Sequence, residues 1–191
     1  YGEAYLKNFL SGFVPYSVGQ GQIARAMDPY SRQARNVMDS IKAKIPGLSE
    51  SLLPRRDIWG EPLPNKTAVG GAAVTAIYEQ RVSRDPVNHA MLDLGIFPAQ
   101  LQRKIRNVEL SDAQYDDFQS IAGSMTKQRL DAIVNSPDYR TWPNHVKHDV
   151  IAEVITQSRE AARGVMMMKA PEIVRQAAQI KLDRANGVAP H

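Results

Sequence analysis

Residues 108–169 hold two long amphipathic patterns joined by the short turn Asn135-Ser136-Pro137-Asp138, and this stretch constrains the fold more than any other. Ser111 is followed three residues later by Gln114, a pairing that satisfies two unpaired backbone N–H groups at the start of a helix. Apolar residues then recur at intervals of three and four, which predicts helices with one apolar face. Because two such helices can bury each other's apolar faces, we expect a helical hairpin over about residues 111–169.

Composition sets the outer limits on fold and function. The chain has 191 residues, of which 43% are hydrophobic and 23% charged, enough for one domain or two small ones. The 24 Lys and Arg residues exceed the 20 Asp and Glu residues by a net charge of +4, and a surplus this small without a basic run is a poor signature of nucleic-acid binding. The lack of Cys excludes a disulfide framework and a thiolate zinc site. No apolar run reaches the roughly 18 residues that cross a bilayer.

The patterns along the chain predict a mainly α protein in three parts. We expect N-terminal helices over residues 1–47, an extended arm rich in Pro, Arg and Trp over residues 48–71, and a helical domain over residues 72–191 that contains the hairpin and a C-terminal helix. The breaks between successive helices are small, which leaves an elongated arrangement open. Because the sequence begins with Tyr1 rather than Met, we also expect a segment of a longer protein.

The N-terminal part contains three local signals. An aromatic stripe in residues 1–14 predicts a short amphipathic helix that packs in a core or on a partner helix. Residues 19–24 match the dinucleotide-binding pattern G-x-G-x-x-[GA], but Pro15 disfavours the strand that this chemistry needs, so we expect a glycine-containing turn. Asp28-Pro29 has the form of a helix cap followed by a first-turn proline, which predicts a helix from Pro29 to Pro46-Gly47.

The arm carries the most individual residues of the chain. Arg55, Arg56, Asp57 and Trp59 suit docking, because guanidinium groups bind carboxylates in two places and an indole supplies a large anchor. Two interpretations stay open. The arm can lie over its own subunit with Trp59 in its own core, or it can dock on another subunit or on a partner protein.

The helical domain begins after the glycines at positions 70 and 71. Residues 72–82 fit both helix and strand, and we favour helix. Asp85-Pro86 predicts a further helix start, with an end at Gly95, and residues 96–106 form a basic connector.

A run of three methionines closes the hairpin. Met166, Met167 and Met168 form a pliable patch that suits core gaps or an adaptable interface, and three consecutive residues of a helix cannot all face inward. Ala170-Pro171 then begins a last helix that ends before Gly187.

The sequence contains few candidates for chemistry. His145 and His148 could present two imidazoles to a metal, but without a carboxylate in a ligand pattern they are typical of surface histidines. Asp116 and Asp117 point to different sides of a helix and so make no acid and base pair, whereas Glu160 and Arg163 suit a surface ion pair. No nucleophile elbow, P-loop or E-x-x-H motif is present. We therefore predict no catalytic residue, no cofactor, no metal and no small-molecule substrate.

Several stretches together carry a family resemblance. They are Phe13-Val14-Pro15-Tyr16-Ser17 with Asp28-Pro29; Pro46-Gly47 through Leu53-Pro54-Arg55-Arg56-Asp57-Ile58-Trp59-Gly60-Glu61-Pro62; and Val108-Glu109-Leu110-Ser111 with Tyr115-Asp116, Ser136-Pro137 and Ser158-Arg159-Glu160-Ala161-Ala162-Arg163. In these, nearly the whole chain resembles the C-terminal part of very large internal virion proteins of tailed bacteriophages. Longer chains of that family carry a lytic transglycosylase or other enzymatic domain elsewhere, and no catalytic residue of such a domain is found in this sequence.

The resemblance implies a structural, assembly or genome-ejection role. It implies a location in the capsid interior or near the portal and tail, delivery to the host envelope on infection, and other virion proteins or further copies of the chain as partners. Transient membrane contact is a further option. We therefore expect a non-enzymatic segment that uses the arm and the methionine patch as contacts.

Three alternatives stay open at this point. The chain could be a nucleic-acid-binding module, a non-catalytic appendage of a lytic transglycosylase, or an enzyme that uses His145, His148 or the turn at residues 19–24. The first would use a set of scattered basic residues: Arg55, Arg56, Arg103, Lys104 and Arg106.

Overall fold

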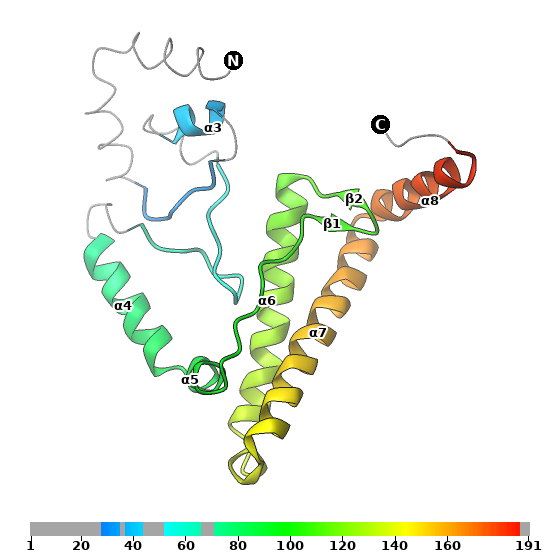
Figure 1. Ribbon diagram of the computed structural model, residues 1–191. Coiled ribbons are helices and arrows are strands. Elements are labelled where there is room, and N and C mark those ends of the chain that lie inside the picture. Colours follow the sequence, from blue (N-terminus) through cyan, green and yellow to red (C-terminus); the bar gives the residue numbers. More distant parts are fainter. Residues whose placement is uncertain (1–27, 35–36, 44–51, 66–70, 188–191) are drawn as a thin grey trace, which may run out of the picture. The chain divides into compact units, whose positions relative to one another are not determined.

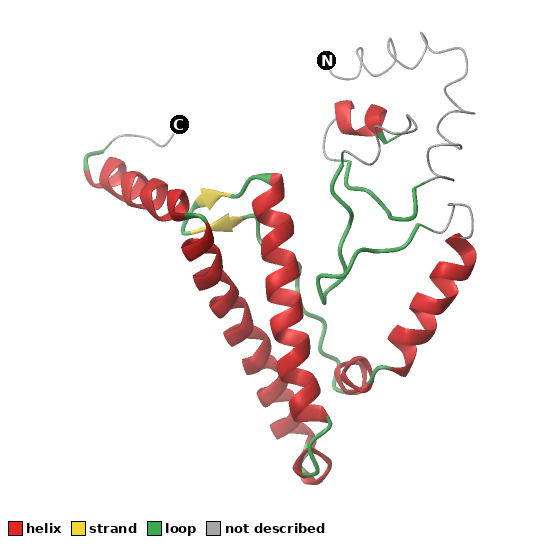
Figure 2. Ribbon diagram, turned by 180° about the vertical axis from the view of Figure 1, so that it is seen from behind, coloured by secondary structure: helices red, strands yellow, loops and turns green. Residues whose placement is uncertain are grey.

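The computed structural model describes residues 28–34, 37–43, 52–65 and 71–187, which form two compact units (Figures 1 and 2). The first unit comprises Tyr1–Asp57 and Pro62–Ser83, and the second comprises Ile58–Glu61 and Arg84–His191. Helices make up most of the described chain, which confirms the predicted mainly α class. The predicted features in residues 1–14 and 19–24 lie outside the described residues.

In the first unit, three extended segments hydrogen-bond to one another in a cycle. The amide of Ser31 donates to the Leu63 carbonyl at 2.9 Å, the amide of Leu63 to the Arg55 carbonyl at 2.8 Å, and the amide of Arg55 to the Ser31 carbonyl at 2.7 Å. Prolines occupy one side of each bridge, where no N–H group is required. The predicted extended, proline-rich arm is thus confirmed over residues 52–65.

The helix predicted from Pro29 is wrong at its start and is confirmed over Val37–Lys42. Residues 29–33 are extended and pair with the arm, and the described helix there, α3, runs over Val37–Lys42. The Asp28 carboxylate accepts the amide of Tyr30 at 3.1 Å, which is a turn and not a helix cap, and it also binds the Arg32 side chain. Pairing with a distant segment therefore outweighs the local cap signal.

The predicted helix starts at the beginning of the helical domain are confirmed. Helix α4 spans Gly71–Arg84. Helix α5 spans Pro86–Asp93, and the Asp85 carboxylate caps it by accepting the Val87 amide at 2.8 Å. Gly95 follows with a φ of +68°, the left-handed conformation that ends helices.

A short β-hairpin lies within the predicted connector and was not expected from the sequence. Strands β1 (Lys104–Ile105) and β2 (Val108–Glu109) pair in antiparallel fashion. Arg106 and Asn107 between them have φ values of 51° and 67°, as a two-residue turn between twisted strands requires. The turn places Ile105 and Val108 on the same buried side.

The predicted helical hairpin is confirmed. Helix α6 spans Asp112–Val134, a 3₁₀ turn (η2) spans Asp138–Thr141, and helix α7 spans Asn144–Lys169; helix α8 follows over Pro171–Ala185. Ser111 and Gln114 form the expected reciprocal cap, in which the Ser111 hydroxyl accepts the Gln114 amide and the Gln114 side chain accepts the Ser111 amide. Figure 1 shows α6 and α7 close together at the end that holds their connecting turn and spreading apart toward the β-hairpin.

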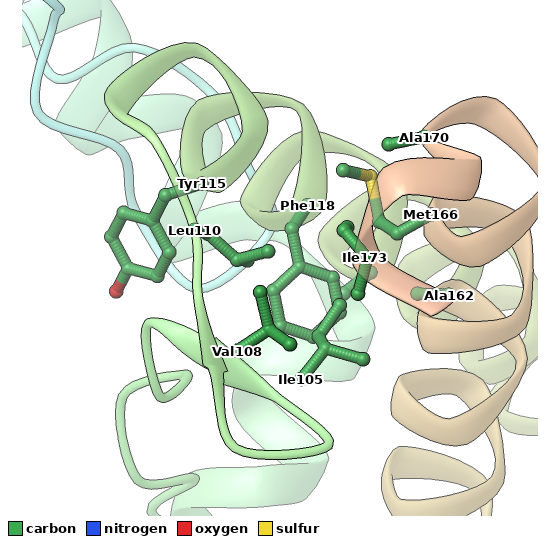
Figure 3. Close-up of a cluster of buried hydrophobic side chains, with 10 residues drawn as sticks. Ile105, Val108, Leu110, Tyr115, Phe118, Ala162, Met166, Ala170 and Ile173 are labelled. Carbon is green, nitrogen blue, oxygen red and sulfur yellow. The ribbon is translucent and has the colours of Figure 1, made fainter. Parts of the chain in front are cut away.

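The second unit has two core clusters at different levels of the hairpin. In the first core cluster, Phe118 of α6 lies between Val108 of β2 and Ile173 of α8 (Figure 3). The second core cluster joins Trp59 of the arm, α5, η2 and the halves of α6 and α7 nearest η2. The buried members of the first are Ile105, Val108, Leu110, Tyr115, Phe118, Ala122, Ala162, Met166, Ala170 and Ile173, and those of the second are Trp59, Val87, Met91, Leu130, Tyr139, Ile151 and Ile155.

Candidate partner-binding site

The charged residues predicted to bind partners lie in the first unit. Arg55 is exposed, and Arg56 and Asp57 are half-buried. The Asp57 carboxylate accepts the Tyr78 hydroxyl of α4 at 2.6 Å. Asp57 thus makes a contact within its own unit, whereas the Arg55 side chain is exposed to solvent.

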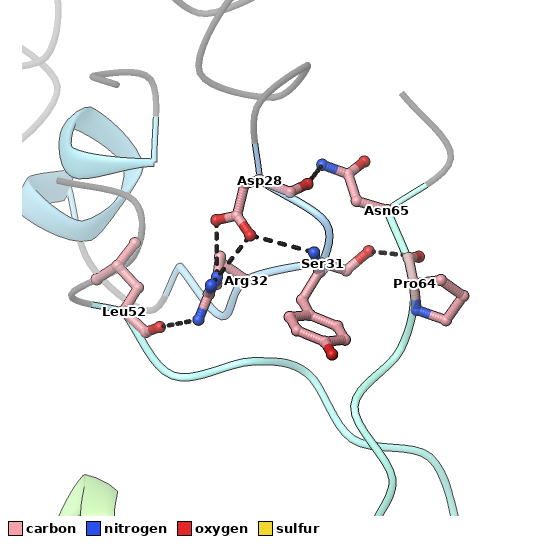
Figure 4. A network of polar contacts seen from close by, with 7 residues as sticks. Asp28, Ser31, Arg32, Leu52, Pro64 and Asn65 are labelled. Atoms are coloured by element: carbon pink, nitrogen blue, oxygen red, sulfur yellow. Dashed lines mark hydrogen bonds and ion pairs between the residues drawn. The ribbon is translucent and has the colours of Figure 1, made fainter. Parts of the chain in front are cut away.

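A partly buried ion pair ties the arm to residues 28–32 (Figure 4). The Arg32 guanidinium approaches both Asp28 oxygens, at 2.7 Å from Nε and 3.0 Å from Nη2, and its Nη1 donates to the Leu52 carbonyl at 2.9 Å. The Asn65 side chain donates to the Asp28 carbonyl at 3.0 Å. Two-point contact by a guanidinium fixes orientation as well as distance, so this pair holds the extended segments in register.

Trp59 belongs to the second unit, together with the rest of the turn Ile58–Glu61. Its side chain is 8% exposed and packs in the second core cluster. The indole Nε1 donates to Asn88 Oδ1 of α5 at 3.0 Å, and the Lys127 ammonium of α6 lies 5.7 Å from the centre of the ring. Of the two interpretations left open by the sequence, the described structure has Trp59 in the core of its own chain.

Lys127 is held in place by two carboxylates. Its Nζ lies 2.9 Å from Asp85 and 2.5 Å from Asp131. Partial burial lowers the pKa of the Lys127 ammonium, but hydrogen bonds and charge attraction from Asp131 and Asp85 outweigh it, so the pKa is raised above its ordinary value. The cation over the Trp59 ring is therefore charged throughout the physiological range.

Two glycines allow the main chain of the turn to lie directly on helix α6. A Cβ on Gly123 would stand 2.1 Å from the Trp59 carbonyl carbon and 2.4 Å from the Gly60 nitrogen. A Cβ on Gly60, whose φ is +76°, would stand 2.6 Å from the Gln119 carbonyl oxygen. All three separations are far below van der Waals contact, so only glycine fits at either position.

The three methionines have three different environments. Met166 is buried in the first core cluster, Met167 packs partly against that cluster, and Met168 is 76% exposed. The structure therefore separates the seven predicted contact residues. Trp59 and Met166 lie in different core clusters, and of the methionines Met168 is the one open to a partner.

Helix α8 presents a second apolar side to solvent. Ile173, Ala177 and Ile180 pack on the first core cluster. Val174, Ala178 and Leu182 follow the exposed side at intervals of four, and Leu182 is 58% exposed. We call these three residues the α8 ridge. The apolar residues of this last helix thus divide between a side on the core and an exposed side.

The other candidates stand apart from one another. His145 and His148 are exposed, with His148 Nδ1 3.3 Å from Asp149 Oδ1, and nowhere in the described ranges do three or more His, Asp or Glu side chains gather as for a metal. Glu160 and Arg163 form the predicted ion pair. Burial, and then the neighbouring charge of Arg163, lowers the pKa of Arg159.

Of the basic residues suggested for nucleic-acid contact, some bind groups of their own chain and others are exposed. Arg103 binds the Asp112 carboxylate at 2.6 Å and lies 4.8 Å from the centre of the Tyr115 ring. Lys104 and Arg106 of the β-hairpin are exposed. Arg103 thus binds residues at the start of α6. The exposed basic charge of the β-hairpin comes from Lys104 and Arg106.

The residues that receive Trp59 were not predicted from the sequence; they are Asn88, Gly123 and Lys127. One signal was available, because an isolated glycine inside a strongly helical pattern usually has a packing reason. Nothing in the local pattern pairs Gly123 with a turn so distant in the chain.

The fold defines the chain as a mainly α protein built on a helical hairpin with a docked turn. No protein-family model, curated protein or solved structure matches the chain. Within the described ranges, no helix has the length and apolar character needed to cross a membrane.

Proposed function

We propose that this chain is a non-enzymatic assembly segment of a tailed-bacteriophage internal virion protein, acting in particle assembly or genome ejection. The sequence resemblance over nearly the whole chain suggests the class. The helical hairpin supports it as a rigid support for surfaces that contact other proteins. In this proposal the segment lies in the capsid interior or near the portal and tail, and its partners are other virion proteins or further copies of itself.

The observation that carries the proposal is the α8 ridge together with Met168. A helix at the surface of a single domain normally turns its apolar side inward and its polar side to water. Helix α8 has a side on the core and also an exposed apolar row, and Met168 precedes it with 76% of its surface exposed. Apolar side chains aligned on one exposed side mark a contact surface more often than scattered ones do.

The arm has a different part in this proposal from the one first expected. Because Trp59 is buried in its own unit, the exposed side chains of the described arm are those of Arg55, Glu61 and Ile58, of which Ile58 is 51% exposed. Nucleic-acid binding receives less support, because Arg103 is engaged by Asp112 and the Tyr115 ring.

Particle incorporation tests the proposal. Leu182→Glu places a charge on the α8 ridge and, in the chain expressed within its parent virion protein, should lower the amount found in purified particles. Gln176→Glu is the matched control, because Gln176 is an exposed residue of the same helix outside the ridge. Circular dichroism checks that both variants fold. Equal incorporation of the two variants would show that the α8 ridge is not the contact surface. The ridge would then no longer support the proposed function.

A further inference from the structure

We propose that the site formed by Asn88, Gly123 and Lys127, called here the turn site, recognises a Trp-Gly turn and accepts that turn from a second copy of this chain as well as from its own. Copies of the chain then join by exchanging the turn Ile58–Glu61. The inference goes beyond the proposed function. If turns do not exchange, the role in the virion and its test through the α8 ridge are unaffected.

The turn site selects its occupant by shape. At Gly123 the helix surface lacks a side chain, and the main chain of Trp59 and Gly60 fills that space at distances that no Cβ could share. Gly60 is in the left-handed conformation, which favours glycine. The site therefore requires a glycine on the helix and a glycine immediately after the tryptophan.

The turn site also selects by chemistry. Asn88 Oδ1 accepts the indole N–H at 3.0 Å, a contact that phenylalanine and leucine cannot make. Lys127 adds a cation 5.7 Å from the ring centre. Since Asp85 and Asp131 hold Lys127 by their own contacts, the cation stays in position when the turn is absent.

The hairpin keeps its first core cluster when the turn leaves. The first core cluster contains residues of the β-hairpin, α6, α7 and α8, and none from the described residues of the arm. Within the second unit, the turn Ile58–Glu61 is the whole contribution from the first 83 residues of the chain. The turn is thus a small insert in a unit whose remaining elements have their own packing.

A second copy of the chain carries the same turn, so it offers the turn site the same contacts. Exchange of an identical element keeps every contact of the closed form and adds the cost of joining two chains. The chain's own turn therefore wins at low concentration, because it is tethered nearby. The turn of a second copy is favoured when the chains are crowded or when the chain's own turn cannot dock.

Two complementary variants of the full chain test this inference. Gly123→Ala closes the turn site and leaves a competent turn, and Trp59→Ala removes the indole and leaves a competent site. Each variant alone should be monomeric in analytical ultracentrifugation, and an equimolar mixture should form a dimer of one chain of each kind. Gly164→Ala replaces Gly123→Ala in the control mixture. A Cβ on Gly164 meets nothing within 4 Å, so that chain keeps its own turn docked and little dimer should form.

A mixture of Gly123→Ala and Trp59→Ala chains that stays monomeric overturns exchange, provided that circular dichroism shows both chains folded. If Gly123→Ala does not fold, a labelled peptide of residues 52–65 added to the Trp59→Ala chain decides instead. Binding of this peptide, with weaker binding of the Gly60→Ala peptide, supports recognition from a second molecule. Absence of binding, or equal binding of both peptides, overturns it.

Discussion

Gly123 of α6 lies against the main chain of Trp59 so closely that a Cβ on Gly123 would stand 2.1 Å from the Trp59 carbonyl carbon. A glycine in the middle of a helix costs roughly 0.5–1 kcal/mol relative to alanine, because it loses more backbone freedom on folding. Here the glycine stands where the turn lies against the helix. The packing of Trp59 on α6 thus depends on the absence of a side chain at Gly123.

Gly123→Ala should therefore destabilise the protein although it favours the helix. We expect the free energy of unfolding to fall by about 1–3 kcal/mol, because the added methyl group forces the turn away. Gly164→Ala, in the open part of α7, should raise it by about 0.5–1 kcal/mol. Urea unfolding followed by circular dichroism compares the two, and equal stability of both variants would contradict the packing at Gly123.

The same dipeptide shows how far local signals predict the fold. Asp-Pro at positions 85 and 86 begins a helix as predicted, whereas Asp-Pro at positions 28 and 29 begins an extended segment. Asp85 caps with its carboxylate, while Asp28 engages Arg32, whose guanidinium reaches the Leu52 carbonyl. The partner at Leu52 is set by the fold, and no local pattern contains it.

For the candidate site, the sequence predicted which residue is the anchor but not where it packs. Trp59 was identified as an anchor from its residue type and its setting in the arm, and it is an anchor within its own chain. The choice between its own core and a partner rested on Gly123, whose importance appears only when the turn and α6 are together. Helix geometry predicted that the three consecutive methionines would not all be buried, and Met168 is exposed in the structure.

The partly buried ion pair of Asp28 and Arg32 should govern the order of the arm. Asp28→Asn keeps the size of the side chain but removes the charge, at a cost of roughly 1.5–3 kcal/mol for hydrogen bonds to a charged group. Hydrogen exchange at the amides of Ser31, Arg55 and Leu63 should then be about 10- to 100-fold faster. Arg55→Lys, at an exposed side chain, is the control and should leave these rates unchanged. Unchanged exchange in Asp28→Asn would show that the backbone cycle holds without the ion pair.

Substitutions at Met166 and Met168 should differ in their effect on stability, because one side chain is in the core and the other is at the surface. Met166→Ala removes a fully buried side chain of the first core cluster and should cost about 2–5 kcal/mol. Met168→Ala changes an exposed side chain and should stay within about 0.5 kcal/mol of the wild type. Thermal and urea unfolding measure both. A large loss in Met168→Ala would place that residue in a core.

The stability of the second unit should fall at high pH because of two groups in and beside the second core cluster. The pKa of Lys127 is raised above its ordinary value of 10.5 because Asp131 and Asp85 outweigh the effect of burial. Burial and then the charge of Asp93 raise the pKa of Tyr139 above its ordinary value of 10.0. Lys147 also lies over the Tyr139 ring, at 5.1 Å from its centre.

In both cases the folded state keeps a proton that the unfolded state loses first. The free energy contributed by each group is therefore fully present below the pKa of the unfolded chain and is lost as the pH rises through the higher folded pKa. We expect stability to decline from about pH 10 upward, and the decline to be shallower in Tyr139→Phe and in Lys127→Met, each of which removes one titration. Urea unfolding from about pH 9 to about pH 11.5 measures these slopes. Slopes equal to the wild type in both variants would show that neither group is linked to folding.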